Sequence, residues 1–475
     1  EGDALIHNDP YMYGSHLFDV MVFKPIFHEG KLFAFTGALA HQLDMGGSPR
    51  AFINETIHEE GLIIPGVFLA KQGVVQEDIL DFITANVRTK YEVRGDLLSE
   101  LAANNRGETR LKALAEKYGV ETLMAYFESI LDYSEKSMRE AIRVVPDCEE
   151  EFEDYLESDG LVDMLIKVKT HVKIEGSDVY VDFEGSAPPV AHGNNNPWSL
   201  THSGAYFAIK AVFGNNVPTN AGAYRAIHLI RPTKPSFLDA PYPHAVGGCT
   251  TVPPQRVVDV IIGALSKVVP EQCCACNGQW SGGIYGGIDP KTNRNFVYNE
   301  SFGCGLGAKY NDDGANGHHS HMSNTANAPT EMIEMEHPIR VLQYSLVQDS
   351  GGAGEYRGGL GLLREVELLT ETNVSIIADR DKIRPYGLFG GQGGLPNAHY
   401  GKFPDGSQHT IAAEKVPAGT ITVQRTSGGG GWGDPAKRDR KLIEWDVLNG
   451  YVSIEAAKRE YGVTIDPETM KIVED

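Results

Sequence analysis

The sequence predicts an α+β fold built from several parts, and three observations indicate this class. Apolar residues alternate in some segments and recur at helical spacing in others, so both strands and helices are expected. The 53 Gly and 25 Pro residues are more typical of a loop-rich α+β or β-rich protein than of a helix bundle. At about 150 residues per domain, the 475-residue chain is long enough for roughly three folding units.

The first two parts are expected at 1–70 and 71–160. Short apolar runs on either side of a turn at Gly30 predict strands in the first part. From Ile79 to Ile142 the apolar residues fall at helical spacing, which predicts a helical subdomain of three or four helices.

The third part, 161–335, is expected to be an α/β region with long Gly- and Asn-rich loops. Strict alternation over 162–184, broken by a turn-forming segment, predicts a hairpin. Helices are predicted near 203–213 and from Pro254 onward. Residues 270–330 show little periodicity, and a loop-heavy region of that length is more often functional than idle.

The fourth part, 336–475, is predicted to be β-rich and to end in helices at 436–449 and 453–461. It contains the run Gly428-Gly429-Gly430-Gly431-Trp432-Gly433, which matches the dinucleotide-binding pattern G-x-G-x-x-G. No second strand with an acidic residue follows, so a tight turn with Pro435 at the first helical position is the favoured interpretation.

Composition excludes several classes of function. With 42 basic and 64 acidic residues the net charge is −22, which argues against a nucleic-acid binder and against an anionic membrane surface. No apolar stretch reaches the roughly 18 residues of a membrane span. Six cysteines in a chain of this length do not predict a disulfide framework, so a cytoplasmic location is expected.

The start of the chain is Glu-Gly-Asp, without Met and without a basic or apolar leader. We therefore expect position 1 to lie inside a longer gene product.

Candidate metal ligands gather near the start of the chain, at His16, Asp19 and His41. Imidazole and carboxylate groups together suit borderline-soft divalent metals. His16 and Asp19 would face opposite ways on a regular strand, so a turn near Gly14 is required. The turn at Gly30 can return His41 to the same place. The alternative is that all three are ordinary loop residues and that Asp9 forms an Asx-turn.

Other motifs carry weaker signals. The C-x-x-C pair Cys273 and Cys276 has no second pair at ribbon spacing, so buried thiols are favoured over a metal cluster. The histidines His318, His319 and His321 are expected at the surface, although one of them could meet a substrate. The sequence contains neither a P-loop nor a Gly-x-Ser-x-Gly elbow.

Taken together, several segments resemble one family, the B-type subunits of ATP-dependent hydantoinases and 5-oxoprolinases, with caprolactamase and the acetone and acetophenone carboxylases as relatives. The matching segments run in family order over nearly the whole chain, at 8–19, 40–47, 60–65, 93–97, 102–104, 218–222, 255–259, 321–325, 349–354, 386–391 and 428–435.

The resemblance implies a hydantoinase-B-like fold and a hetero-oligomer. The partner would be a larger A-type subunit of actin/hexokinase-like fold, which binds ATP and activates the substrate by phosphorylation. The B-type subunit would hold a divalent metal, zinc or manganese, through His16, Asp19 and His41. The family pattern also has an Asp well upstream, which has no counterpart here.

Further site residues follow from this carry-over. Asp9, Asp44 and Glu60 are the candidates for general base or for support of the ligands. Two interpretations stay open for five apolar residues near the ligands: they form an apolar wall that favours a lactam or aryl ketone as substrate, or they take part in ordinary core packing. These residues are Met12, Tyr13, Phe18, Leu43 and Met45.

The predicted function is hydrolysis of a cyclic amide, such as a hydantoin, 5-oxoproline or a lactam, after phosphoryl activation. Two alternatives remain open: a subunit of an ATP-dependent ketone carboxylase, and a non-catalytic structural subunit of such a complex.

Overall fold

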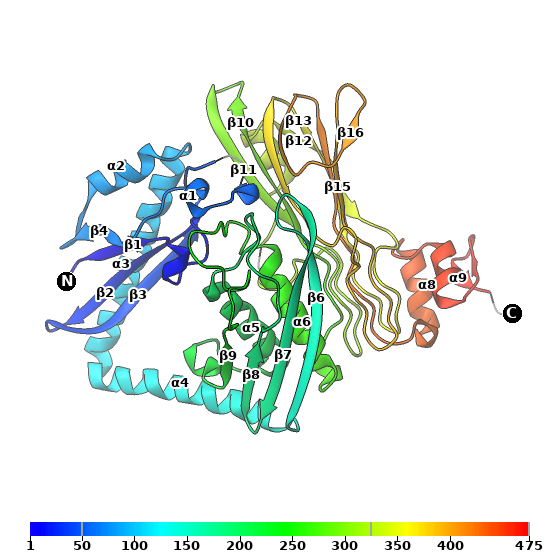
Figure 1. Ribbon diagram of the computed structural model, residues 1–475, viewed down its shortest axis with the longest axis horizontal. Coiled ribbons are helices and arrows are strands. Elements are labelled where there is room, and N and C mark those ends of the chain that lie inside the picture. Colours follow the sequence, from blue (N-terminus) through cyan, green and yellow to red (C-terminus); the bar gives the residue numbers. More distant parts are fainter. Residues whose placement is uncertain (49–50, 324, 474–475) are drawn as a thin grey trace.

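The structure is a computed structural model that describes residues 1–48, 51–323 and 325–473. Helices and strands are mixed along the chain and the strands form several separate sheets, which confirms the α+β class (Figure 1). Within the described residues, no helix is both long and apolar enough to cross a membrane.

The N-terminal sheet has the strand order β3-β2-β1-β4-β5. Two helices cover one face of it, where Val93, Leu97 and Leu101 pack against Ile6 and Val22. Its elements are β1 (Ala4–His7), β2 (Asp19–His28), β3 (Lys31–His41), β4 (Val67–Lys71), β5 (Val74–Val75), α2 (Glu77–Ala85) and α3 (Lys90–Tyr118), with the short helices η1 (Pro10–Met12), η2 (Ala51–Ile53) and α1 (Ile57–Glu60) in the connections.

The central part begins where α4 (Val120–Arg143) runs from the N-terminal region to a second sheet of order β6-β7-β8-β9 (Figure 1). The predicted hairpin and both predicted helices are present. The elements are β6 (Cys148–Ser158), β7 (Asp163–Glu175), β8 (Asp178–Asp182), α5 (Trp198–Phe213), η3 (Ala221–Tyr224), β9 (Ile227–Ile230), α6 (Val252–Ser266) and η4 (Pro270–Gln272). Because β6 pairs with β7, residues 148–158 belong to this sheet and not to the helical region expected over 71–160.

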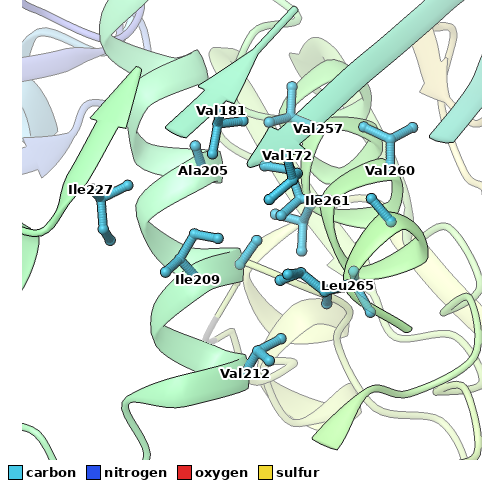
Figure 2. Close-up of a cluster of buried hydrophobic side chains, with 14 of the residues drawn as sticks. Val172, Val181, Ala205, Ile209, Val212, Ile227, Val257, Val260, Ile261 and Leu265 are labelled. Carbon is cyan, nitrogen blue, oxygen red and sulfur yellow. The ribbon is translucent and has the colours of Figure 1, made fainter. Parts of the chain in front are cut away.

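The core of the central part lies between this sheet and the helices α5 and α6. Figure 2 shows Val172 and Val181 from the strands facing Ile209 of α5 and Ile261 of α6. Every residue of α6 is buried: its apolar residues pack in this core, while its polar residues Arg256 and Asp259 are paired with each other.

Two further sheets pack face to face in the C-terminal half. Their orders are β11-β10-β14-β17 and β12-β13-β18-β15-β16, and Tyr285, Val366 and Val374 lie in the core between them. The elements are β10 (Ser281–Asp289), β11 (Arg294–Phe302), α7 (Thr330–Glu336), β12 (Ile339–Leu346), β13 (Leu362–Leu368), β14 (Thr372–Ile377), β15 (Ala398–Lys402), β16 (Gln408–His409), β17 (Ala413–Val416) and β18 (Ile421–Arg425).

The expectation of a loop-heavy region over 270–330 was partly wrong, because β10 and β11 form a long hairpin there. The sequence of β10 contains four glycines, and glycines hide the alternation of apolar and polar side chains that identifies a strand.

The glycine run 428–431 forms part of a layer of extended segments that lie side by side (Figure 1). Gly429 N donates to Gly359 O at 3.0 Å, Gly359 N donates to Leu306 O at 2.8 Å, and Gly430 N donates to Cys276 O at 2.8 Å. The run is buried in this layer, so the expected tight turn was wrong.

The chain ends in a small unit of two helices and a short hairpin that packs around Val447, Ala457 and Ile465. The elements are η5 (Pro435–Lys437), α8 (Arg440–Leu448), α9 (Ile454–Tyr461), β19 (Ile465–Asp466) and β20 (Lys471–Ile472). Pro435 does open a helix as predicted, but that helix is a single 3-10 turn and α8 begins only at Arg440.

Candidate metal centre

The hairpin of β2 and β3 brings two of the three predicted ligands together. Its register pairs Asp19, the first residue of β2, with His41, the last residue of β3. Paired residues on adjacent strands have neighbouring side chains, and here His41 Nδ1 lies 3.2 Å from Asp19 Oδ1.

His16 reaches the same point from the turn that precedes β2. Asp19 N donates to His16 O at 3.1 Å, which closes this turn, and His16 Nδ1 lies 3.2 Å from Asp19 Oδ2. The rings of His16 and His41 are 4.9 Å apart between centroids. One donor atom from each of the three side chains lies within 4.8 Å of the other two.

The loop that carries His16 is held by a buried amide and by the central part of the molecule. Asn8 Nδ2 donates to Leu17 O at 2.7 Å. Ser199 Oγ donates to Gly14 O at 2.6 Å, and Tyr11 Oη donates to His244 O at 2.6 Å. The geometry of the ligands therefore depends on contacts between two parts of the chain.

The chemistry of the three side chains fits a divalent cation. His16 Nδ1 is buried and, among the described residues, has no hydrogen bond of good geometry, although Asp19 is close. Burial raises the pKa of Asp19, but the adjacent His16 and His41 lower it by a larger amount. The pKa of Asp19 is therefore well below its ordinary value, and the carboxylate is ionised. His41 keeps 46% of its side chain exposed, so one side of the group is open. Two imidazoles and one carboxylate with an open side match the usual pattern of a catalytic rather than a structural site.

A cavity of about 950 Å³ opens beside His16 and His41, and Asp19 is not among the residues that line it. All three large parts of the chain line it, with His16, His41 and Glu60 from the N-terminal region, Thr251 from the central part, and Asn295 and Tyr298 from β11. A volume of this size is sufficient for a small organic molecule.

Glu60 is a buried carboxyl whose pKa is raised. It is 4% exposed, Oε1 accepts a hydrogen bond from Gly247 N, and Oε2 has no hydrogen-bond partner among the described residues. Burial raises the pKa of Glu60 to about 7, although the Gly247 amide and nearby His16 lower it. A carboxyl with this pKa exchanges protons readily near neutral pH.

Asp44 also lines the cavity but its carboxylate is fully engaged. Arg88 donates to it through both its main-chain N and Nη1, the latter at 2.8 Å, and Gly46 N donates at 2.9 Å. These bonds favour a positioning role for Asp44 over that of a base.

Asp9 is not among the residues that line the cavity. Its side chain accepts from Tyr11 N at 2.9 Å and caps η1, which is the Asx-turn of the alternative interpretation.

The expected apolar wall is only partly present. Phe18 and Leu43 line the cavity. Met45 is buried in the core of the N-terminal sheet instead, while Met12 and Tyr13 are 57% and 91% exposed. Met12 ends η1 and Tyr13 follows it in the left-handed conformation, at a φ of 69°, a local geometry that spacing along the sequence does not reveal.

Two of the three later histidines are not surface residues, contrary to expectation. His319 lines the cavity, and His321 is buried with Nε2 3.2 Å from Asp259 Oδ1. The signal in the sequence was their place in the long region rich in Gly and Asn. Asn324, in the adjacent matching segment, lies outside the described residues.

A second group of possible ligands lies in the core, at Asp154, Asp259 and Cys276. Two buried guanidinium groups occupy its surroundings, since Arg380 Nη2 lies 2.6 Å from Asp154 Oδ2 and Arg256 Nη1 lies 2.8 Å from Asp259 Oδ2. The positive charge that these carboxylates need is therefore supplied by arginine, which makes this a structural ion network.

The sequence of this chain is similar to that of several known proteins. The family described as Hydantoinase B/oxoprolinase matches residues 1–435. The chain is 32% identical over 482 residues to the caprolactamase subunit beta of Pseudomonas jessenii, covering 98% of this chain and 83% of that protein. It is 32% identical over 469 residues to 5-oxoprolinase 1 of Arabidopsis thaliana, of which it spans 36%.

Solved structures show the same fold. The crystal structure of the ATP-dependent caprolactamase from Pseudomonas jessenii superposes with a TM-score of 0.90 at 31% identity, over 98% of this chain and 83% of that one. A nucleotide-free acetone carboxylase superposes with a TM-score of 0.89 at 18% identity, over 100% of this chain and 70% of that one.

Proposed function

The chain belongs to the hydantoinase B/oxoprolinase family, and on that premise we propose that it is the metal-holding catalytic subunit of an ATP-dependent complex that hydrolyses a cyclic amide. The observation that carries the proposal is the convergence of His16, Asp19 and His41 at one point, where His16 and His41 line a cavity that Glu60 also lines.

In this proposal His16, Asp19 and His41 hold zinc or manganese. When bound, the cation supplies positive charge that polarises an oxygen atom of the substrate or of water. Glu60 accepts the proton of the water that attacks the activated carbon, because its buried, unpartnered Oε2 and its pKa of about 7 suit proton transfer at neutral pH. Phe18 and Leu43 line the same cavity and make part of its wall apolar.

ATP enters through the partner in this proposal, because the chain has no P-loop of its own. An A-type subunit of actin/hexokinase-like fold would phosphorylate the amide oxygen. Attack of water on the activated carbon would then break the ring C–N bond, with the proton going to the leaving nitrogen, and leave an acyl phosphate. A second water would hydrolyse the acyl phosphate to carboxylate and phosphate, and the ATP consumed offsets the unfavourable opening of an unstrained ring.

Hydrolysis is favoured over carboxylation by the named relatives. Two of the relatives at 32% identity are named for a caprolactamase and a 5-oxoprolinase, whereas the acetone carboxylase is 18% identical and supports the fold alone. The substrate is accordingly a hydantoin, 5-oxoproline or a lactam.

The test uses the purified complex of this chain with its A-type partner. We expect about one divalent metal ion per chain and ATP-dependent ring opening of 5-oxoproline, a hydantoin or caprolactam, both lost in His16→Ala. Incorporation of labelled bicarbonate into a keto acid would replace the hydrolase by the carboxylase. A metal content near zero that His16→Ala does not change would leave a structural subunit.

A further inference from the structure

Arg88 contributes a guanidinium group to the wall of the cavity that holds the candidate metal ligands. It lies in the connection between α2 and α3, and 38% of its side chain is exposed, whereas its partner Asp44 is 5% exposed. The carboxylate is thus buried behind a guanidinium that remains accessible.

Both Nη atoms of this guanidinium donate hydrogen bonds, including a long one of 3.4 Å from Nη1 to Gly46 O. Nη1 donates to Asp44 Oδ1 at 2.8 Å and Nη2 donates to Gly47 O at 2.6 Å. Among the residues that the structure describes, Nε donates to none. A held guanidinium with free donors binds carboxylate or phosphate oxygens well, because little side-chain freedom is lost on binding.

The other charged groups of the cavity wall do not compete for this role. Lys415 Nζ lies 2.5 Å from Glu371 Oε1, and both of these side chains are more than half exposed to solvent. Glu300 pairs with Arg364 in the protein interior. Arg88 is therefore the cation of the cavity wall that is both anchored by a buried acid and open to a ligand.

We propose that Arg88 is the residue that recognises an oxyanion of the substrate, and that Asp44 holds it in place. The proposal rests on the proposed function and deepens it, since it restricts the substrate to one that carries an oxyanion while it lies in the cavity. The oxyanion has two sources: a carboxylate already present, as in 5-oxoproline, or the phosphoryl group added by the partner.

Binding and kinetics are measured on the complex with Arg88→Lys, Arg88→Met and the double variant Asp44→Asn/Arg88→Met, which avoids a buried unpaired carboxylate. Arg94→Met is the matched control, because Arg94 also forms ion pairs near the start of α3 but does not line the cavity. Circular dichroism and metal content verify that each variant is folded and that the ligand triad is intact.

Titration calorimetry with inorganic phosphate and with 5-oxoproline, each with and without added zinc, reports binding directly. We expect the affinity for at least one of these two ligands to fall about tenfold or more in both Met variants, to fall less in Arg88→Lys, and to stay unchanged in Arg94→Met. Unchanged affinity for both ligands in folded Arg88→Met overturns the proposal. Because binding is measured without turnover, loss of the proposed hydrolase activity does not affect this readout.

Steady-state kinetics separate the two sources of the oxyanion. If the carboxylate is recognised, Arg88→Met raises KM for 5-oxoproline but leaves KM for caprolactam, which has no carboxylate, unchanged. If the phosphoryl group is recognised, kcat falls for both substrates. Wild-type KM and kcat for both substrates in this variant contradict either form.

Discussion

At the scale of single residues, the candidate site combines side chains of different solvent exposure. His16 is 4% exposed, Asp19 14% and His41 46%. A buried ligand is positioned by packing, whereas an exposed one leaves a side open for a substrate. We therefore expect the two histidines to contribute unequally to a metal site.

His16→Ala should lower zinc affinity by about 100-fold or more, since even outer residues that only support ligands contribute 10- to 100-fold. His41→Ala should lower it less, because water can replace an exposed imidazole. Competition with a chromophoric chelator measures both. His28→Ala, at the opposite end of the same hairpin, is the control and should bind zinc as the wild type does. Equal zinc affinity in His16→Ala and wild type would contradict the proposed metal site.

Glu100 gives a prediction for the pH dependence of stability. Its side chain is 5% exposed and accepts from Gln42 Nε2 at 2.9 Å. Burial and the nearby Asp96 raise the pKa of Glu100 to about 8. The folded state therefore binds more protons than the unfolded state between about pH 4.5 and 8, and the free energy of unfolding should fall as pH rises through this range.

Glu100→Gln should remove this contribution, so its free energy of unfolding should rise relative to wild type by the order of 1 kcal/mol between pH 5.5 and 7.5. Urea unfolding at the two pH values measures the difference. The control Glu92→Gln changes an exposed residue of the same helix and should follow the wild type. Parallel behaviour of Glu100→Gln and wild type would contradict the prediction.

At the scale of elements, the layer of glycine segments depends on main chains that approach too closely for side chains. A Cβ atom on Gly429 would lie 2.0 Å from Leu306 O, and one on Gly305 would lie 1.9 Å from Gly359 O. These segments follow β11 and β18 and precede β13, so a displaced backbone there affects both C-terminal sheets.

Gly429→Ala should lower the free energy of unfolding by about 3 kcal/mol or more, because rigid main chain surrounds the new methyl group. Gly95→Ala is the matched control. Gly95 lies exposed within α3 and a Cβ there meets no atom within 4 Å, so this change should stabilise by about 0.5 to 1 kcal/mol. Thermal and urea unfolding distinguish the two, and equal effects would exclude close packing as the cause.

At the scale of the whole molecule, a buried ion network joins the central part to the C-terminal half. Arg380, just after β14, contacts Asp154 of β6 and Asp259 of α6 at 2.6 and 3.3 Å. Arg256 of α6 also contacts Asp379. The cavity of the candidate site is likewise lined by residues from separate parts of the chain.

Arg380→Met should destabilise the protein by about 3 to 5 kcal/mol, because it leaves carboxylates buried without a counter-charge. Arg340→Met, which removes an ion pair with Glu367 at the surface, should cost no more than about 1 kcal/mol. Urea unfolding compares the two variants. If Arg380→Met is as stable as Arg340→Met, the network does not hold the two parts together.

The local pattern of the sequence determined the elements whose signal lies within a few residues. The alternation on either side of Glu175 specified the hairpin of β7 and β8, and the apolar run after Pro254 specified α6. The turn at Gly30 indicated that His41 could return beside His16, because a hairpin takes its register from its turn, and the structure shows that the register pairs His41 with Asp19. Glycine-rich β10 was missed for the opposite reason, since it has too few side chains to show a period.

Only the tertiary structure decided which side chains the cavity contains. Arg88 and His319 line it, Asp9 and Met45 do not, and Glu60 differs from Asp44 in having a free buried oxygen. These outcomes depend on contacts between residues far apart in the chain, and burial and partners set the pKa of a carboxyl more than its neighbours in sequence do. The sequence therefore determined which chemical groups are available, while packing between the parts determined where each of them acts.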